Sequence, residues 1–221
     1  MTRVLNTLRR EPQSGEIRSV VIFLHGYGAN GADLIRLADP LAEHLPDTLF
    51  LSPDAPEEIP GMPMGRQWFP IPWIDGSSEE ESARGMAAAA DDLNAFLDAV
   101  MVDEDVLPEQ VVLFGFSQGT MMALHVGLRR EDELAGIVAF SGRLIAPELL
   151  EDEVVSKPPI LLVHGDMDDV VPVQSLPEAA EALQKAGFTD VYAHVMKGTA
   201  HGIAPDGLSV ALAFMRDKLG L

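Results

Sequence analysis

Short runs of apolar residues, many of them β-branched, recur along the chain and alternate with segments of helical hydrophobic spacing. The apolar runs lie at residues 20–24, 48–51, 111–114, 136–140, 160–163 and 191–196. Because most of them are continuous rather than alternating, each is expected to be a strand that is covered on both faces. Strands that alternate with helices predict an α/β fold with a mostly parallel central sheet and helices on both faces. An antiparallel edge strand is expected at residues 3–8.

Helices are predicted at about residues 31–45, 79–102, 176–186 and 208–219, and a further helical pattern follows residue 117. Two of them follow the sequence signature of a capping box, in which a serine and the glutamate three residues later bond each other's backbone N–H groups. These pairs are Ser78 with Glu81 and Ser175 with Glu178. Pro40 is expected to break or kink the first helix. No repeat and no linker interrupts the pattern, so the sequence predicts a single domain over residues 1–221.

Residues 52–78 have no regular period, although they hold six of the sixteen prolines and both tryptophans. A loop of this length in a compact domain is usually functional or disordered, and its apolar content argues against disorder. Two compatible roles are open: the loop covers the sheet, or it lines a substrate groove. The residues expected to bind substrate are Met64, Trp68, Phe69 and Trp73.

The composition of the chain excludes several classes of binding partner and several kinds of reactive site. The formal net charge is −20, from 35 acidic and 15 basic residues, so nucleic acid and anionic lipid headgroups are not expected to bind. The absence of cysteine excludes disulfides, thiolate metal sites and a cysteine nucleophile. No apolar run approaches the roughly 20 residues needed to span a bilayer. A cytoplasmic protein without stable membrane insertion is therefore expected, and no sequence signature of a metal site or a cofactor is present.

Reactive residues gather where the predicted strands end. The segments after the strands read HGYG (25–28), SPDAP (52–56), GFSQG (115–119), SGR (141–143), HGDMDD (164–169) and KGTAHG (197–202). Ligands of open α/β sheets bind beyond the carboxyl ends of the strands. Glycines, histidines, a serine and carboxylates are therefore expected to meet at one edge of the sheet, as a ligand-binding or catalytic site requires.

The GFSQG segment has the G-x-S-x-G pattern directly after an apolar strand and before a helical pattern. In that context the pattern forms a sharp turn that lifts the serine hydroxyl clear of the sheet, and small flanking residues let strand and helix approach closely. Ser117 is therefore the candidate nucleophile. The N–H of Gln118, which follows it, and the N–H of Tyr27 in the HGYG loop are the candidate donors to an oxyanion.

A serine nucleophile needs a base and an orienting carboxylate, which follow the serine in the chain on this kind of fold. The histidines after Ser117 are His125, His164, His194 and His201. His201 is favoured because it lies in a glycine-containing loop just past the last predicted strand, and His194 is the runner-up. Three carboxylates compete for the acid role, and spacing alone does not separate them: Asp166, Asp168 and Asp169.

The segments LHGYGAN, GFSQG, HGDMDDVVP and AHG, in this order, resemble the phospholipase/carboxylesterase family of α/β hydrolases, which includes the acyl-protein thioesterases. The resemblance runs from about residue 20 to the C-terminus. It implies Ser117 as nucleophile, Asp168 as acid and His201 as base, with the N–H groups of Tyr27 and Gln118 as the oxyanion hole. It also implies an α/β-hydrolase fold.

Two departures from the thioesterases stand out within this resemblance. Tyr27 takes the place of a leucine, and Pro70 follows Phe69 where the thioesterases usually carry aspartate. Both departures favour a general carboxylesterase. Residues 142–158 are too few for a separate cap domain, which favours a shallow, open groove.

The function expected from the sequence is hydrolysis of small carboxylic esters with short to medium acyl chains, through an acyl-enzyme intermediate. The alternatives are an acyl thioesterase or lysophospholipase on the same three residues, or a non-catalytic small-molecule-binding module. The presence of all three candidate residues argues against the binding module, which would be free to lose any of them. A homodimer is expected by analogy with the family.

Overall fold

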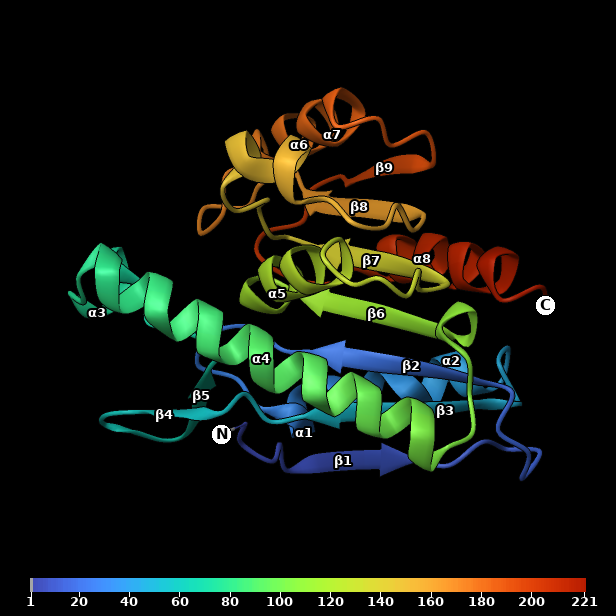
Figure 1. Ribbon diagram of the computed structural model, residues 1–221. Coiled ribbons are helices and arrows are strands. Elements are labelled where there is room, and N and C mark those ends of the chain that lie inside the picture. Colours follow the sequence, from blue (N-terminus) through green and yellow to red (C-terminus); the bar gives the residue numbers. More distant parts are fainter. Residues whose placement is uncertain (1) are drawn as a thin grey trace.

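The computed structural model, which describes residues 2–221, is built on a central sheet with the strand order β1-β3-β2-β6-β7-β8-β9 (Figure 1). The strands are β1 (Thr7–Arg10), β2 (Ser19–Leu24), β3 (Thr48–Pro53), β6 (Val111–Phe116), β7 (Gly136–Phe140), β8 (Ile160–Gly165) and β9 (Val191–Met196). Strand β1 pairs antiparallel with β3, and the other neighbours in this sheet are parallel. The mostly parallel sheet predicted from the sequence is confirmed, and its antiparallel edge strand begins at Thr7 rather than at residue 3.

Helices pack on both faces of the sheet, as predicted (Figure 1). The α-helices of this layer arrangement are α1 (Gly31–Leu34), α2 (Ala38–Ala42), α4 (Glu79–Asp103), α5 (Gln118–Gly127), α6 (Leu150–Glu153), α7 (Ser175–Lys185) and α8 (Pro205–Lys218). Successive side chains of a strand point to opposite faces. In β2, Val20 and Ile22 join the core beneath α4, α5 and α7, whereas Val21 and Phe23 join the core beneath α2 and α8. Two apolar cores explain why the strand sequences are continuously apolar.

One of the two predicted capping boxes forms. The Ser78 hydroxyl accepts the N–H of Glu81 at 3.2 Å, and the Glu81 carboxylate accepts the N–H of Ser78 at 2.8 Å. The box expected at Ser175 and Glu178 is wrong, because no side chain caps α7. The chain turns before that helix, where the N–H of Ser175 bonds to the backbone oxygen of Pro172, and Ser175 is already its first residue.

The predicted first helix is interrupted, although not at its proline. Helix α1 ends at Leu34, a 3-10 turn covers Ile35–Leu37, and α2 begins at Ala38. Pro40 lies inside the first turn of α2 rather than at the break. A proline is tolerated there because the first N–H groups of a helix have no partner within that helix.

Helix α4 is 25 residues long and opens with three glutamates, Glu79 to Glu81. It crosses one face of the sheet and buries Leu93 and Leu97 against it (Figure 1). Among residues 2–221, no helix is both long enough and apolar enough to cross a membrane.

Residues 52–78 contain more regular structure than the sequence predicts. Strands β4 (Glu57–Ile59) and β5 (Met62–Gln67) form an antiparallel hairpin, and α3 (Pro72–Asp75) follows it. In Figure 1 the hairpin and α3 lie near the end of the sheet where β2 and β6 terminate. The segment therefore borders the edge at which the candidate catalytic residues were expected.

Candidate active site

Ser117 lies at the sharp turn between β6 and α5. Its backbone has φ 54° and ψ −115°, a conformation that is unfavourable for a residue with a side chain and that recurs at functional sites. The N–H of Ser117 donates to the backbone oxygen of Phe140 at 2.9 Å, which ties the turn to β7. A Cβ at Gly119 would overlap the backbone oxygen of Leu24, and one at Gly115 would lie 2.5 Å from backbone atoms of α5. Both glycines are therefore needed for the close approach of strand and helix.

His201 reaches Ser117 from the loop between β9 and α8. Its Nε2 lies 3.0 Å from the Ser117 Oγ. The imidazole packs against the ring of Phe116, with 4.9 Å between the ring centroids, which helps to fix its orientation. This separation between imidazole nitrogen and hydroxyl oxygen is within the range for proton transfer from a serine to a histidine.

Asp168 holds the other side of the same imidazole. Its Oδ2 accepts a hydrogen bond from His201 Nδ1 at 2.7 Å, and its Oδ1 accepts the N–H groups of Val170 and Val171 at 2.9 and 2.8 Å. Burial acts to raise the pKa of Asp168, but the hydrogen bonds from His201, Val171 and Val170 outweigh it and lower that pKa below its ordinary value. An ionised Asp168 places the imidazole proton on Nδ1, so Nε2 is free to accept the serine proton.

The two competing aspartates lie elsewhere. The Asp166 carboxylate accepts the N–H of Gly198 at 2.6 Å, which joins the loops after β8 and β9. Asp169 is exposed. Spacing alone left three carboxylates open, and Asp168, which the family resemblance implies, is the one that the fold brings to His201.

The other histidines after Ser117 lie away from its hydroxyl, although His164 Nε2 is 3.4 Å from Asp168 Oδ2. His194 Nε2 lies 3.0 Å from Asp206 Oδ2 on α8. His164 is buried and donates from Nε2 to the backbone oxygen of Val171 at 2.8 Å. Burial, together with a nearby arginine, lowers the pKa of His125 to about 4. Neither His194 nor His125 hydrogen-bonds to Ser117, and His201 is the histidine that does so within residues 2–221.

The two residues expected to supply oxyanion donors, Tyr27 and Gln118, both line the groove that contains Ser117. Gln118 is the first residue of α5, and Tyr27 lines the same groove as Ser117. Within residues 2–221, the backbone N–H groups of Tyr27 and Gln118 make no hydrogen bond, so both are available to a ligand. The loop of Tyr27 is held by the next residue, since the N–H of Gly28 donates to the backbone oxygen of Arg66 at 2.9 Å.

His25 also supports this loop, a role that sequence reasoning missed. Its buried ring accepts the N–H of Ala55 at Nε2, at 2.9 Å, and Nδ1 lies 2.8 Å from the backbone oxygen of Gly26. This pattern requires a neutral ring with its proton on Nδ1, in agreement with the burial that lowers the pKa of His25. The only sequence signal was the HG pair after a strand, which is weak by itself.

The side chain of Gln118 is the second structural element that the sequence did not reveal. It is fully buried, accepts the N–H of Trp68 at Oε1 (2.9 Å) and donates from Nε2 to the backbone oxygen of Phe69 (2.7 Å). The Trp68 indole N–H in turn donates to the backbone oxygen of His25 at 3.0 Å. Gln118 thus joins the start of α5 to the segment that follows β5, next to the candidate oxyanion hole.

Replacement of this side chain should destabilise the protein. Gln118→Leu leaves the N–H of Trp68 and the carbonyl of Phe69 buried without partners, so we expect the free energy of unfolding to fall by about 2–4 kcal/mol. Chemical denaturation measures the change. The matched control is Gln184→Leu, because Gln184 is exposed on α7. An equal, small effect of both substitutions would contradict the role given to the buried amide.

An open groove of about 350 Å³ leads to Ser117 and His201. Its walls come from the segment around α3, from α5 and from the loop after β8, and they include Ile74, Met121 and Val170. The groove is largely apolar, as a site for an acyl chain requires. Ile74 and Val170 are exposed at its rim, so the groove is open to solvent.

The structure separates the four residues expected to bind substrate. Trp73 lines the groove and is 65% exposed. Trp68 and Phe69 belong to the buried core and do not line it, because their backbone groups are held by Gln118 and their side chains pack beneath the loop. Met64 is 75% exposed on β5 and does not line it either. The loop therefore both covers the sheet and lines the groove, with different residues in the two roles.

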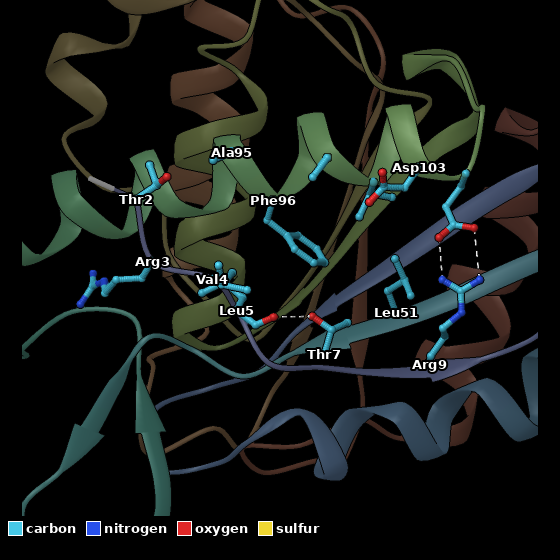
Figure 2. A pocket seen from close by; sticks show the side chains of 13 residues that line it. Thr2, Arg3, Val4, Leu5, Thr7, Arg9, Leu51, Ala95, Phe96 and Asp103 are labelled. Atoms are coloured by element: carbon cyan, nitrogen blue, oxygen red, sulfur yellow. Dashed lines mark hydrogen bonds and ion pairs between the residues drawn. The ribbon is translucent and has the colours of Figure 1, made fainter.

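A separate cavity of about 420 Å³ lies between the N-terminal segment and α4 (Figure 2). Leu5, Leu51 and Phe96 line it, and Arg9 at one end pairs with Glu104. Ser117, His201 and Asp168 do not border this cavity. Within residues 2–221, no group of three or more His, Cys, Asp or Glu side chains is arranged to hold a metal ion.

Several known proteins are similar to this chain in sequence and in fold. The sequence profile described as phospholipase/carboxylesterase matches residues 8–219. Acyl-protein thioesterase 1 of Saccharomyces cerevisiae is 32% identical over 97% of this chain and 99% of its own length. The crystal structure of esterase PE8 has a TM-score of 0.91, with 42% identity over 97% of this chain and 99% of that one. Acyl-protein thioesterase 2 of Zea mays has a TM-score of 0.79 at 25% identity, again over 97% of this chain and 99% of its own. This chain, an α/β hydrolase by its fold, therefore belongs to the phospholipase/carboxylesterase family.

Proposed function

We propose that this protein is a serine carboxylesterase that cleaves small esters with short to medium acyl chains. The observation that carries the proposal is the continuous hydrogen-bonded series Ser117–His201–Asp168, with 3.0 Å between Ser117 and His201 and 2.7 Å between His201 and Asp168. The site opens directly into an apolar groove, so a bound ester can reach the serine hydroxyl. Membership of a hydrolase family supports the same conclusion.

In the first half of the proposed reaction, Ser117 Oγ attacks the carbonyl carbon of the ester while His201 Nε2 takes its proton. The carbonyl oxygen gains negative charge, and the free N–H groups of Tyr27 and Gln118 stabilise it. His201 then gives its proton to the oxygen of the departing alcohol. An acyl group remains bound to Ser117, and Asp168 stabilises the imidazolium that forms between the two proton transfers.

In the second half, water replaces the alcohol. His201 removes a proton from the water, which attacks the acyl carbon, and the same two N–H groups stabilise the oxyanion. The proton returns to Ser117 Oγ as the carboxylic acid leaves. The reaction consumes one ester and one water and releases one acid and one alcohol, and the protein is restored without a cofactor.

An acyl thioesterase is the second candidate, because several relatives over nearly the whole chain carry that name, including the one from Saccharomyces cerevisiae. The same three residues would serve both reactions. A thiolate leaves more readily than an alkoxide, so thioester cleavage depends less on proton donation by His201. We favour the carboxylesterase because of the similarity to esterase PE8 over 97% of the chain at 42% identity.

A substrate profile tests the proposal. We expect kcat/KM on p-nitrophenyl esters to be highest between butyrate and octanoate and to fall for palmitate, because the groove has a volume of only about 350 Å³ and is open to solvent. Octanoyl thioester is compared with octanoyl ester at the same concentration. A clear preference for the thioester would favour the thioesterase, and no turnover of either substrate would overturn both proposals.

A further inference from the structure

Arg143 follows β7 and lies at the junction of two cavities. One is the groove that contains Ser117 and His201. The other, of about 340 Å³, is lined by Arg143 together with Pro147, Gln174 and Glu178. Arg143 is therefore placed where part of a substrate bound at Ser117 can reach it.

The guanidinium of Arg143 has no anionic partner in the part of the chain that the structure describes. Within residues 2–221, Arg143 makes no ion pair and no hydrogen bond, although the chain has 35 acidic residues against 15 basic ones. Most of the other arginines lie within salt-bridge distance of a carboxylate; Arg129, Arg130 and Arg9 are examples. Arg143 therefore lacks a carboxylate partner although the protein is acidic, and it lies beside the candidate nucleophile. Its N–H donors are available to a ligand.

Trp73 holds this side chain in place. The Arg143 guanidinium carbon lies 5.6 Å from the centroid of the Trp73 ring, which is within the range of a cation–π contact. A contact with an aromatic ring leaves N–H groups of the guanidinium free for other acceptors. These N–H groups match the two oxygens of a carboxylate, and a guanidinium held over a ring loses less conformational freedom when it binds.

We propose that Arg143 binds a carboxylate on the substrate, so that the enzyme prefers esters that carry a free carboxylate, such as monoesters of dicarboxylic acids. A single guanidinium balances one negative charge, whereas Glu178 across the second cavity disfavours a group that itself carries two charges, such as a phosphate monoester. Trp73 acts as the positioning residue. The inference rests on the proposed esterase function, because the bound carboxylate is unchanged while the ester bond is hydrolysed.

Matched pairs of substrates test this preference. Monoethyl glutarate is compared with ethyl pentanoate, in which a methyl group takes the place of the carboxylate of the acyl part. γ-Acetoxybutyrate is compared with butyl acetate, which makes the same change in the alcohol part. The pair that responds to substitution of Arg143 identifies which side of the ester faces it.

We expect Arg143→Gln to lower the ratio of kcat/KM for the anionic ester to that for its neutral partner by roughly 10- to 100-fold, mainly through KM. Arg143→Lys keeps the positive charge but not the planar pair of N–H donors, so it should restore part of the ratio. The matched control is Arg216→Gln, since Arg216 is exposed on α8 and does not line the groove. That control removes the same charge and should leave the ratio unchanged.

A binding measurement separates this inference from the proposed function. Calorimetry with glutarate, the product of the anionic ester, should detect binding to the wild type and not to Arg143→Gln. If no ester is hydrolysed but glutarate binding still depends on Arg143, the esterase proposal fails and the carboxylate site stands. If Arg143→Gln leaves both substrate ratios within about twofold of the wild type, or glutarate binds equally to both proteins, the carboxylate site is overturned.

Discussion

Ser117→Ala is expected to lower kcat for ester hydrolysis by at least about 10⁴-fold, because the attacking oxygen is lost and only the oxyanion donors and the groove remain. The fold should survive. Ser117 makes its contact with β7 through its backbone N–H, and its side chain caps no helix. Steady-state kinetics on p-nitrophenyl butyrate measures the loss, and chemical denaturation checks that the free energy of unfolding is preserved.

A serine-directed fluorophosphonate provides an independent readout for the same variant. It should label the wild type at Ser117 and leave Ser117→Ala unlabelled. Ser209→Ala is the matched control, because Ser209 is exposed on α8 and its hydroxyl donates only to the backbone oxygen of Pro205. Retention of more than a few per cent of the activity by folded Ser117→Ala, or labelling at another serine, would remove Ser117 as the nucleophile.

Asp168→Asn should reduce kcat by about 10³- to 10⁴-fold, similar to the loss for the equivalent change in the serine protease triad. The Asn amide would donate to His201 Nδ1, which places the imidazole proton on Nε2 and blocks removal of the Ser117 proton. Asp166→Asn and Asp169→Asn are the matched controls, since neither carboxylate contacts His201. A larger loss of kcat in either control than in Asp168→Asn would show that Asp168 is not the acid that orients His201.

The lowered pKa of Asp168 also predicts how stability depends on pH. A carboxyl group whose pKa is lower in the folded than in the unfolded protein stabilises the fold above its unfolded pKa of about 4, and this contribution is lost as the pH falls through the folded pKa. Asn cannot ionise. The wild type should therefore lose free energy of unfolding relative to Asp168→Asn as the pH falls below about 4. Urea titrations at several pH values measure it, and a constant difference would contradict the lowered pKa of Asp168.

Local sequence was sufficient for the parallel strands of the central sheet and for the serine turn, but not for the hairpin of β4 and β5. The apolar run before Ser117 has partners on both faces of the sheet, so its strand character depends little on which helices cover it. The two glycines around the serine are required by backbone contacts between neighbouring elements. Such short-range constraints leave a clear pattern in the chain.

Helix starts were less predictable, because a capping serine needs the right backbone conformation as well as the right spacing. Ser78 is extended and outside its helix, so its box forms. Ser175 has the same spacing to its glutamate, but a preceding turn makes it the first helical residue. The tertiary path of the loop after β8 overrides the local signal there.

Taken alone, the sequence determined the alternation of the parallel strands with their main helices, the sharp turn at Ser117 and the edge of the sheet where reactive residues gather, because these follow from local periodicity and from the direction of parallel strands. Spacing left three carboxylates open and the family resemblance pointed to Asp168, but only the tertiary structure placed that carboxylate within hydrogen-bond distance of His201. The tertiary structure also decided that Trp68 is buried while Trp73 lines the groove, and that Arg143 lies over the Trp73 ring without an anionic partner among residues 2–221. These features join residues far apart in the chain. Their distances depend on how loops from different strands meet, which no local pattern encodes.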